Sequence, residues 1–134
     1  MFNDRRNRTN TYARWLFGIA GMFNLAVGFA LLFARAKLAA MLRLDPVGGT
    51  GVVFANLTGM FVALFGVAYL RIAGDPAAYR PYIHLGAAGK LFAVVCVLVP
   101  WWMGAVPATL PIVVSADLVF ALLFLDFLRR TRPL

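Results

Sequence analysis

Four long apolar segments constrain the fold of this chain more than any other feature of its sequence. Each has the roughly 17 to 25 residues with which an α-helix crosses the hydrocarbon core of a bilayer. They leave little chain for a separate soluble domain, so the sequence predicts one domain over residues 1–134, an all-α integral membrane four-helix bundle. The predicted transmembrane spans are residues 15–33, 52–73, 82–100 and 106–128.

Basic residues flank these segments and set the predicted orientation. The chain has 13 Lys and Arg against 5 Asp and Glu, a formal net charge of +8. A nucleic-acid binder can carry such a charge, but here the basic residues stand beside apolar spans, so we expect a lipid bilayer as partner and no nucleic acid. The positive-inside rule predicts that both termini are cytoplasmic. The basic residues on that side are Arg5, Arg6, Arg8, Arg14, Arg71, Arg80, Arg129, Arg130 and Arg132.

Two polar stretches lie outside the spans. Residues 1–11 have no apolar period and predict a mobile tail or a short interfacial segment. Residues 35–46, RAKLAAMLRLDP, alternate basic residues with Leu and Met. That alternation suits a short helix lying in the outer membrane interface. An interfacial helix at residues 36–44 and a plain linker are both open.

One charged residue, Lys90, lies inside the third apolar segment, HLGAAGKLFAVVCVLVPWW. An unpaired lysine or aspartate at the centre of a membrane helix costs about 2.5 to 3.5 kcal/mol on insertion scales, so Lys90 needs a partner. Asp117 in the fourth span is as far from the loop centre near Met103 and Gly104 as Lys90 is. An antiparallel helix pair therefore brings the two to one depth. Asn24, near mid-depth in the first span, is the predicted third member of this polar centre.

Two interpretations of the polar centre are open. In the first, Lys90, Asp117 and Asn24 fix the pairing of the helices and carry no chemistry. In the second, they contact a proton, an ion or the head group of a ligand, because ionisable groups inside membranes mark functional sites.

Small residues recur at helical spacing and predict helix-packing faces, since they allow two backbones to approach closely. These stripes exceed what one helical hairpin requires, so we expect a homo-oligomer or a larger membrane complex. The residues are Gly18, Gly21 and Gly28 in the first span, Asn56, Gly59, Ala63 and Gly66 in the second, and Gly86 and Gly89 beside Lys90 in the third.

Residues suited to metal binding or catalysis are scarce. Cys96 is the only cysteine and stands in an apolar span, where we expect a small buried hydrophobic side chain. His84 is the only histidine, without a second imidazole or an acidic cluster near it in the sequence. No triad or phosphate-loop pattern is present. The sequence therefore predicts no metal site and no catalytic residue, and no cofactor is evident.

The glycine-rich first span, the Gly89-Lys90 pair in the third span and the basic C-terminus together resemble DoxX-like small bacterial inner-membrane proteins. The likeness covers most of the chain. Some members of that group are accessory subunits of quinone-linked redox complexes. The resemblance therefore implies a multi-pass protein of the bacterial inner (cytoplasmic) membrane, with an accessory or ligand-binding role and a quinone or lipid as the ligand.

Three functions are compatible with these features. The favoured one is a non-catalytic accessory or hydrophobic-ligand-binding membrane protein with a Lys90–Asp117 polar centre. The second is a small oligomeric transporter or channel, in which the same residues would line the path. The third is a membrane enzyme acting on a lipid or isoprenoid, with Asp117 as acid or base beside Lys90.

Overall fold

A computed structural model describes the backbone of residues 2–131 and the side chains of residues 8–131. This part of the chain is helical and has no strand, which confirms the predicted all-α class. Four of its helices are long and apolar enough to cross a membrane, as in a multi-pass membrane protein. Arg132 and the side chains of Arg5 and Arg6 lie outside the described part. The helices are α1 (Phe2–Phe33), α2 (Arg35–Met41), α3 (Gly51–Gly74), α4 (Arg80–Trp102) and α5 (Thr109–Arg130).

The first helix is longer than the apolar span that predicted it. Residues 2–14 continue α1, and the expected change to a tail or a separate interfacial segment does not occur. Once a helix is nucleated, each added residue gains a hydrogen bond for little further entropy cost. Contacts with α5 support this extension. Ala13 is buried, and the ring of Tyr12 lies 6.3 Å from that of Phe127, measured between centroids.

Two other helix limits also differ from the predicted ones. α2 covers Arg35–Met41 and not residues 36–44, because a turn at Arg43 follows it. α5 begins at Thr109 and not at residue 106, because Pro107 disfavours helical geometry at the residue before it. Pro111 is tolerated in the first turn of α5, where a backbone N–H has no partner within the helix.

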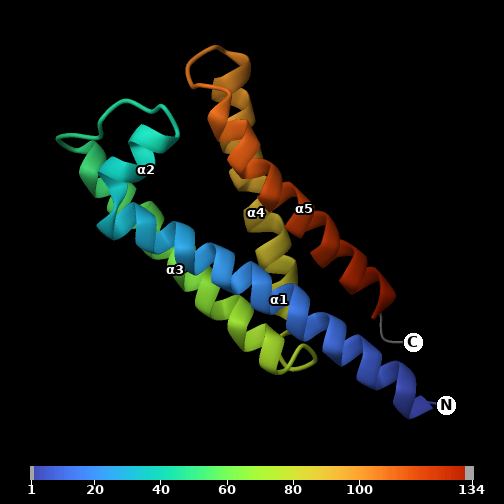
Figure 1. Cartoon of the computed structure of the whole chain (residues 1–134). Coiled ribbons are helices and arrows are strands. Elements are labelled where there is room, and N and C mark those ends of the chain that lie inside the picture. Colours follow the sequence, from blue (N-terminus) through green and yellow to red (C-terminus); the bar gives the residue numbers. More distant parts are fainter. Residues whose placement is uncertain (1, 132–134) are drawn as a thin grey trace.

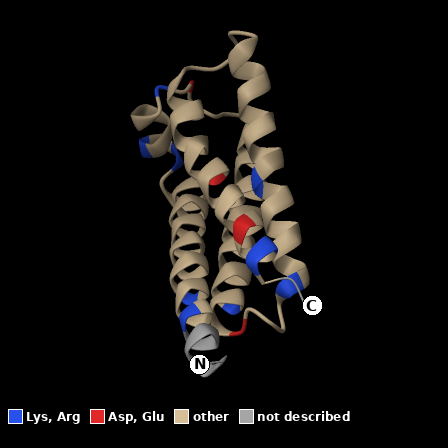
Figure 2. Ribbon diagram, turned by 90° about the vertical axis from the view of Figure 1, so that its right-hand side faces the viewer, with Lys and Arg blue, Asp and Glu red and all other residues tan. Residues whose placement is uncertain are grey.

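The four long helices form two antiparallel pairs (Figure 1). α1 packs along α3, and α4 packs along α5, whereas contacts between the pairs are much sparser. The pairs meet near the chain termini and diverge toward α2 and the loop that joins α4 to α5. Figure 2 shows Lys and Arg gathered around α2 and around the ends that carry the termini. The bundle is therefore closed at the terminal end and opened at the other.

Glycines bring α1 and α3 into close contact. A methyl group added at Gly21 would lie 2.9 Å from the carbonyl oxygen of Gly66, and one added at Gly28 would lie 2.8 Å from that of Gly59. The same added methyl at Gly28 would lie 2.8 Å from the Cβ of Ala63. The two small-residue stripes thus face one another within a single chain, in register along the antiparallel pair.

Two residues predicted to be on these packing faces are placed elsewhere. Gly18 has no atom of another element within 4 Å of the position of a Cβ. Asn56 is exposed and accepts a hydrogen bond of 2.9 Å from the guanidinium of Arg35. Within one chain neither residue lies at the α1–α3 contact, because helical spacing assigns a face to a residue but does not fix where along that face the partner helix makes contact.

An aromatic core joins the two helix pairs at the terminal end. Phe17 of α1 lies between Phe124 and Phe127 of α5, with ring centroids 4.7 and 5.4 Å away. Tyr69 of α3 meets Phe124 edge-on at 5.1 Å. Arg80 adds a polar connection at the same end, because its guanidinium donates to the carbonyl of Leu128 at 2.9 Å and so caps the C-terminus of α5.

The outer surface of the helices is apolar. Exposed large hydrophobic side chains occur on all four long helices, including Phe54, Phe92 and Leu122. Cys96 belongs to this surface, so its predicted burial was wrong. A contiguous apolar surface of this extent is what lipid contact requires, and a water-soluble monomer rarely has one.

Candidate ligand site between the two helix pairs

Lys90 on α4 points into the space between the helix pairs. Its side chain is 3% exposed, and its Nζ lies 2.5 Å from Oδ1 of Asp117 on α5. The two residues lie at one level of the α4–α5 pair, as their equal distances from the connecting loop require. A buried ammonium is thereby paired with a carboxylate, which avoids the cost of an isolated charge in an apolar environment.

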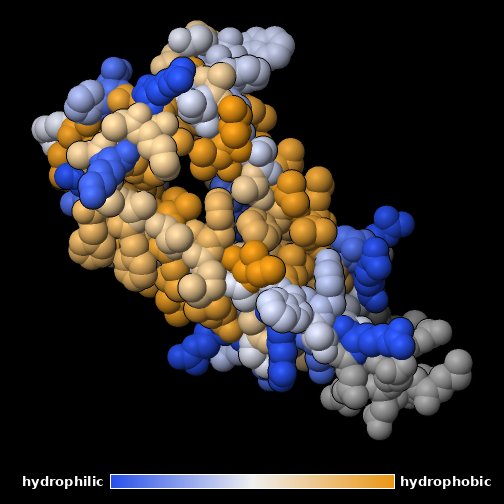
Figure 3. Space-filling view, viewed as in Figure 1, coloured by the Kyte–Doolittle hydropathy of each residue, from blue (hydrophilic) through white to orange (hydrophobic). Residues whose placement is uncertain are grey.

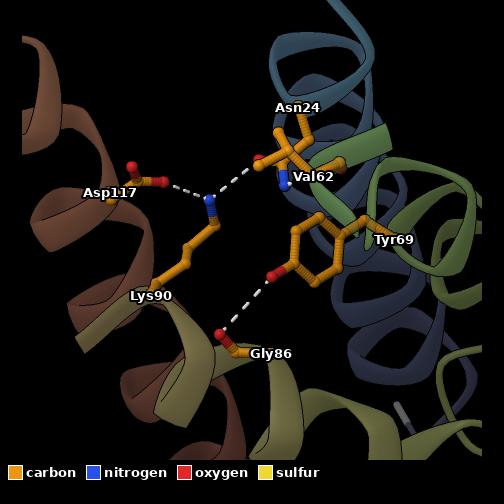
Figure 4. Close-up of polar contacts among 6 residues, drawn as sticks. All are labelled: Asn24, Val62, Tyr69, Gly86, Lys90 and Asp117. Atoms are coloured by element: carbon orange, nitrogen blue, oxygen red, sulfur yellow. Dashed lines mark hydrogen bonds and ion pairs between the residues drawn. The ribbon is translucent and has the colours of Figure 1, made fainter. Parts of the chain in front are cut away.

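Asn24 extends this contact to the other helix pair. Lys90 Nζ donates to Asn24 Oδ1 at 2.9 Å, and Asn24 Nδ2 donates to the carbonyl oxygen of Val62 on α3 at 3.3 Å (Figure 4). One chain of polar contacts therefore runs through α5, α4, α1 and α3. The structure brings together all three residues that the sequence assigned to the polar centre.

Aromatic rings enclose the ammonium group on its remaining sides. Lys90 Nζ lies 5.9 Å from the ring centroid of Phe23, 5.3 Å from that of Tyr69 and 5.1 Å from that of Phe120. The negative faces of such rings attract a cation, and desolvation strengthens the attraction. These three residues were not among those predicted from the sequence.

Tyr69 is the clearest residue that sequence reasoning missed. It is 1% exposed and packs against Gly86 of α4, to whose carbonyl oxygen its hydroxyl donates at 3.4 Å. A signal for this role was present: Val62, Gly66 and Tyr69 have the spacing of one helix face. A methyl group added at Gly89, also predicted for packing, would lie 3.5 Å from the ring of Phe65, an ordinary contact distance.

A cavity of about 330 Å³ adjoins the polar centre. Its wall is formed by all four long helices and is mainly apolar, with Asn24, Lys90 and Asp117 as polar members. At its rim Thr58, Phe61 and Val113 are exposed, so the cavity opens sideways between the helix pairs. Figure 3 shows the surface hollowed between the two pairs, with apolar residues around the hollow. The remaining lining residues are Phe23, Val27, Val62, Phe65, Tyr69, Gly89 and Ala93.

Protein closes one end of the cavity, and a hydrogen bond links the two helix pairs beyond the other end. Toward the termini lies the aromatic core, in which Phe17 and Phe124 are completely buried. Toward the opposite end, the hydroxyl of Thr109 donates to the carbonyl oxygen of Leu42 and links the start of α5 to the turn after α2. The sideways opening is therefore the direct route for a molecule to reach Lys90 and Asp117.

The described residues contain no cluster of side chains suited to metal binding. His84 is exposed on α4, far along the chain from the acidic residues of α5. Within residues 8–131 no three His, Cys, Asp or Glu side chains come together in a way that could hold a metal ion.

Comparison of the chain with protein-family models, with curated proteins and with solved structures finds no match. The resemblance to DoxX-like proteins is neither supported nor contradicted by this result and stays a prediction.

Proposed function

We propose that this protein crosses the membrane four times and binds a hydrophobic ligand, such as a quinone or a lipid, whose polar head reaches the polar centre formed by Lys90, Asp117 and Asn24. The observation that carries the proposal is that the polar centre lines a cavity and is not sealed within a packed core. A purely structural ion pair needs no free volume beside it, whereas a ligand site needs a cavity that the ligand can fill.

The cavity has the character of a small-molecule site. Such sites occupy about 300 to 1,000 Å³ and combine apolar walls with a few polar groups that orient the ligand. The cavity of about 330 Å³ fits the lower end of this range, and Asn24, Lys90 and Asp117 form one hydrogen-bonded group in its wall. Because it opens sideways between apolar helices, its ligand would arrive from the bilayer.

Binding is a better interpretation than conduction. The aromatic core around Phe17 and Phe124 fills the space between the cavity and the terminal end, which leaves a single copy no continuous polar path. An acid or base role for Asp117 in an enzyme stays the alternative, because Lys90 pairs with Asp117 as that role also requires.

We also propose the orientation that charge placement predicts, with both termini in the cytoplasm of a bacterium. Its support is that the N-terminal end of α1 and the C-terminal end of α5 lie on the same side of the molecule (Figure 1). An accessory role in an oligomer or a larger complex stays a prediction. The glycine stripes of α1 and α3 pack on each other, so they no longer argue for a partner.

Native mass spectrometry from lipid nanodiscs tests the binding function. The measurement is the fraction of protein that retains a molecule carried over from the membrane. We expect a retained ligand in the parent protein and a several-fold lower fraction in Ala93→Leu, which fills the cavity. Ala26→Leu, on the exposed face of α1, is the matched control and should match the parent. A parent protein that retains no ligand would overturn the proposal.

A further inference from the structure

Only one oxygen of the Asp117 carboxylate accepts a hydrogen bond from the described residues. Its Oδ1 accepts from Lys90, and within the described residues the structure gives this carboxylate no other hydrogen-bond donor (Figure 4). No fully buried side-chain oxygen among these residues lacks a partner, so the second oxygen is not enclosed by protein. Asp117 is 22% exposed and lines the cavity.

The other polar side chains at the cavity each have a partner within the protein, and the hydroxyl of Thr58 at the rim donates to the carbonyl of Phe54. The ammonium of Lys90 donates to Asp117 and Asn24, and its remaining side faces aromatic rings 5.1 to 5.9 Å away. Asn24 uses its oxygen for Lys90 and its nitrogen for the carbonyl of Val62. The site therefore presents the acceptor oxygen of Asp117 to the cavity, whereas the ammonium of Lys90 is buried in the cavity wall.

This arrangement selects among head groups by charge. An anionic head would meet the carboxylate oxygen and not the ammonium, which is 3% exposed. A cationic head would add a second positive charge to a carboxylate that Lys90 already balances. A neutral hydroxyl satisfies the acceptor and leaves the pair balanced, and hydrogen bonds to ionised acceptors are about twice as strong as neutral ones.

Building on the binding function proposed above, we infer that the ligand of this cavity is a lipid-soluble molecule with a neutral hydroxyl head that donates to the free oxygen of Asp117. The cavity holds such a head and the first part of a hydrocarbon chain, and the rest of the chain follows the sideways opening past Phe61 and Val113. Isoprenoid alcohols and quinols share this chemistry.

The test compares pairs of probes of which one member carries a hydroxyl donor and the other does not. Farnesol and farnesyl methyl ether form one matched pair, and decylubiquinol and decylubiquinone form another. Native mass spectrometry of the protein in phosphatidylcholine nanodiscs measures occupancy at equal mole fractions. We expect about a tenfold tighter apparent Kd for at least one hydroxyl probe than for its partner, a difference equal to about 1.4 kcal/mol. A preference within the farnesol pair alone identifies a lipid alcohol, and one within the quinol pair alone identifies a quinol.

Asp117→Asn provides the decisive variant. Its amide oxygen still accepts from Lys90 while its NH₂ faces the cavity, so the preference for the hydroxyl should vanish or reverse. Asp126→Asn is the control, because that aspartate pairs with Arg130 at the exposed end of α5 and should leave the preference intact. If Asp117→Asn does not fold, the parent protein's discrimination within each probe pair still decides the inference.

Different outcomes would contradict the hydroxyl head group and the ligand-binding function. Equal occupancy by both members of each pair, or stronger binding of oleate than of farnesol, would overturn the hydroxyl assignment and leave ligand binding in place. A parent protein that takes up none of the probes and retains no membrane-derived molecule would overturn both.

Discussion

At the scale of single residues, the site depends on how the charge and the hydrogen bonds of the Lys90 ammonium are paired. Lys90 has one ionic partner, one amide partner and three aromatic neighbours, which come from the other three long helices. Removing either charge leaves the other in an apolar environment without compensation. Removing both leaves a neutral pair of similar shape, which membranes tolerate.

A double-mutant cycle measures this dependence. Lys90→Met and Asp117→Asn should each lower the free energy of unfolding by about 2 to 3 kcal/mol, the scale of an unpaired charge at a helix centre. The double variant should lose at least about 1 kcal/mol less than the sum of the two. Reversible unfolding in mixed micelles gives the values. Arg35→Met is the control because its bond to Asn56 is exposed, so its loss should stay below about 1 kcal/mol.

The cycle also decides between the two interpretations of the polar centre. Recovery in the double variant together with unchanged ligand retention indicates a structural pair. Single variants that keep their stability but lose the ligand contradict a structural role.

At the scale of helices, close approach of α1 and α3 depends on positions without a side chain. Gly28→Ala places a methyl 2.8 Å from backbone and side-chain atoms of α3, so the helices must separate at a cost of about 1 to 3 kcal/mol. Gly18→Ala meets nothing within 4 Å and should stabilise the protein by up to about 1 kcal/mol through helix propensity. Thermal unfolding of both variants in the same detergent compares them. Equal changes in the unfolding temperature of the two variants would show that α1 and α3 are not packed as described.

Two helix ends differ in the residue at their left-handed position. The turn after α4 uses Gly104 at φ 73°, and the turn after α2 uses Arg43 at φ 56°. In each turn the left-handed residue and the residue after it donate their N–H groups back to the last helical turn. Leu44 donates to the carbonyl of Ala39, and Ala105 donates to that of Pro100. Arg43→Gly should therefore raise the free energy of unfolding by about 1 kcal/mol, and Gly104→Ala should lower it by a similar amount. If both variants changed the free energy of unfolding in the same direction, the left-handed conformation assigned to these two residues would be contradicted.

At the scale of the whole molecule, sequence reasoning recovered the helices and the level of the polar centre. Apolar length identified four long helices, and equal distance from a loop placed Lys90 opposite Asp117. It did not recover the divergence of the two pairs or the role of Tyr69. Depth along a helix follows from residue counting, but the angle between helix pairs depends on how side chains such as Phe17 and Phe124 fill the space between them.

That aromatic core gives the final prediction. Phe124 is completely buried where α1, α3 and α5 meet, so Phe124→Ala should cost about 3 to 5 kcal/mol and loosen the joint between the pairs. Phe92→Ala, on the exposed face of α4, is the matched control and should change stability little. Because the core bounds one end of the cavity, Phe124→Ala should also lower ligand retention in nanodiscs at temperatures where the protein stays folded. A stable variant with unchanged retention would mean that the cavity does not depend on the closed terminal end.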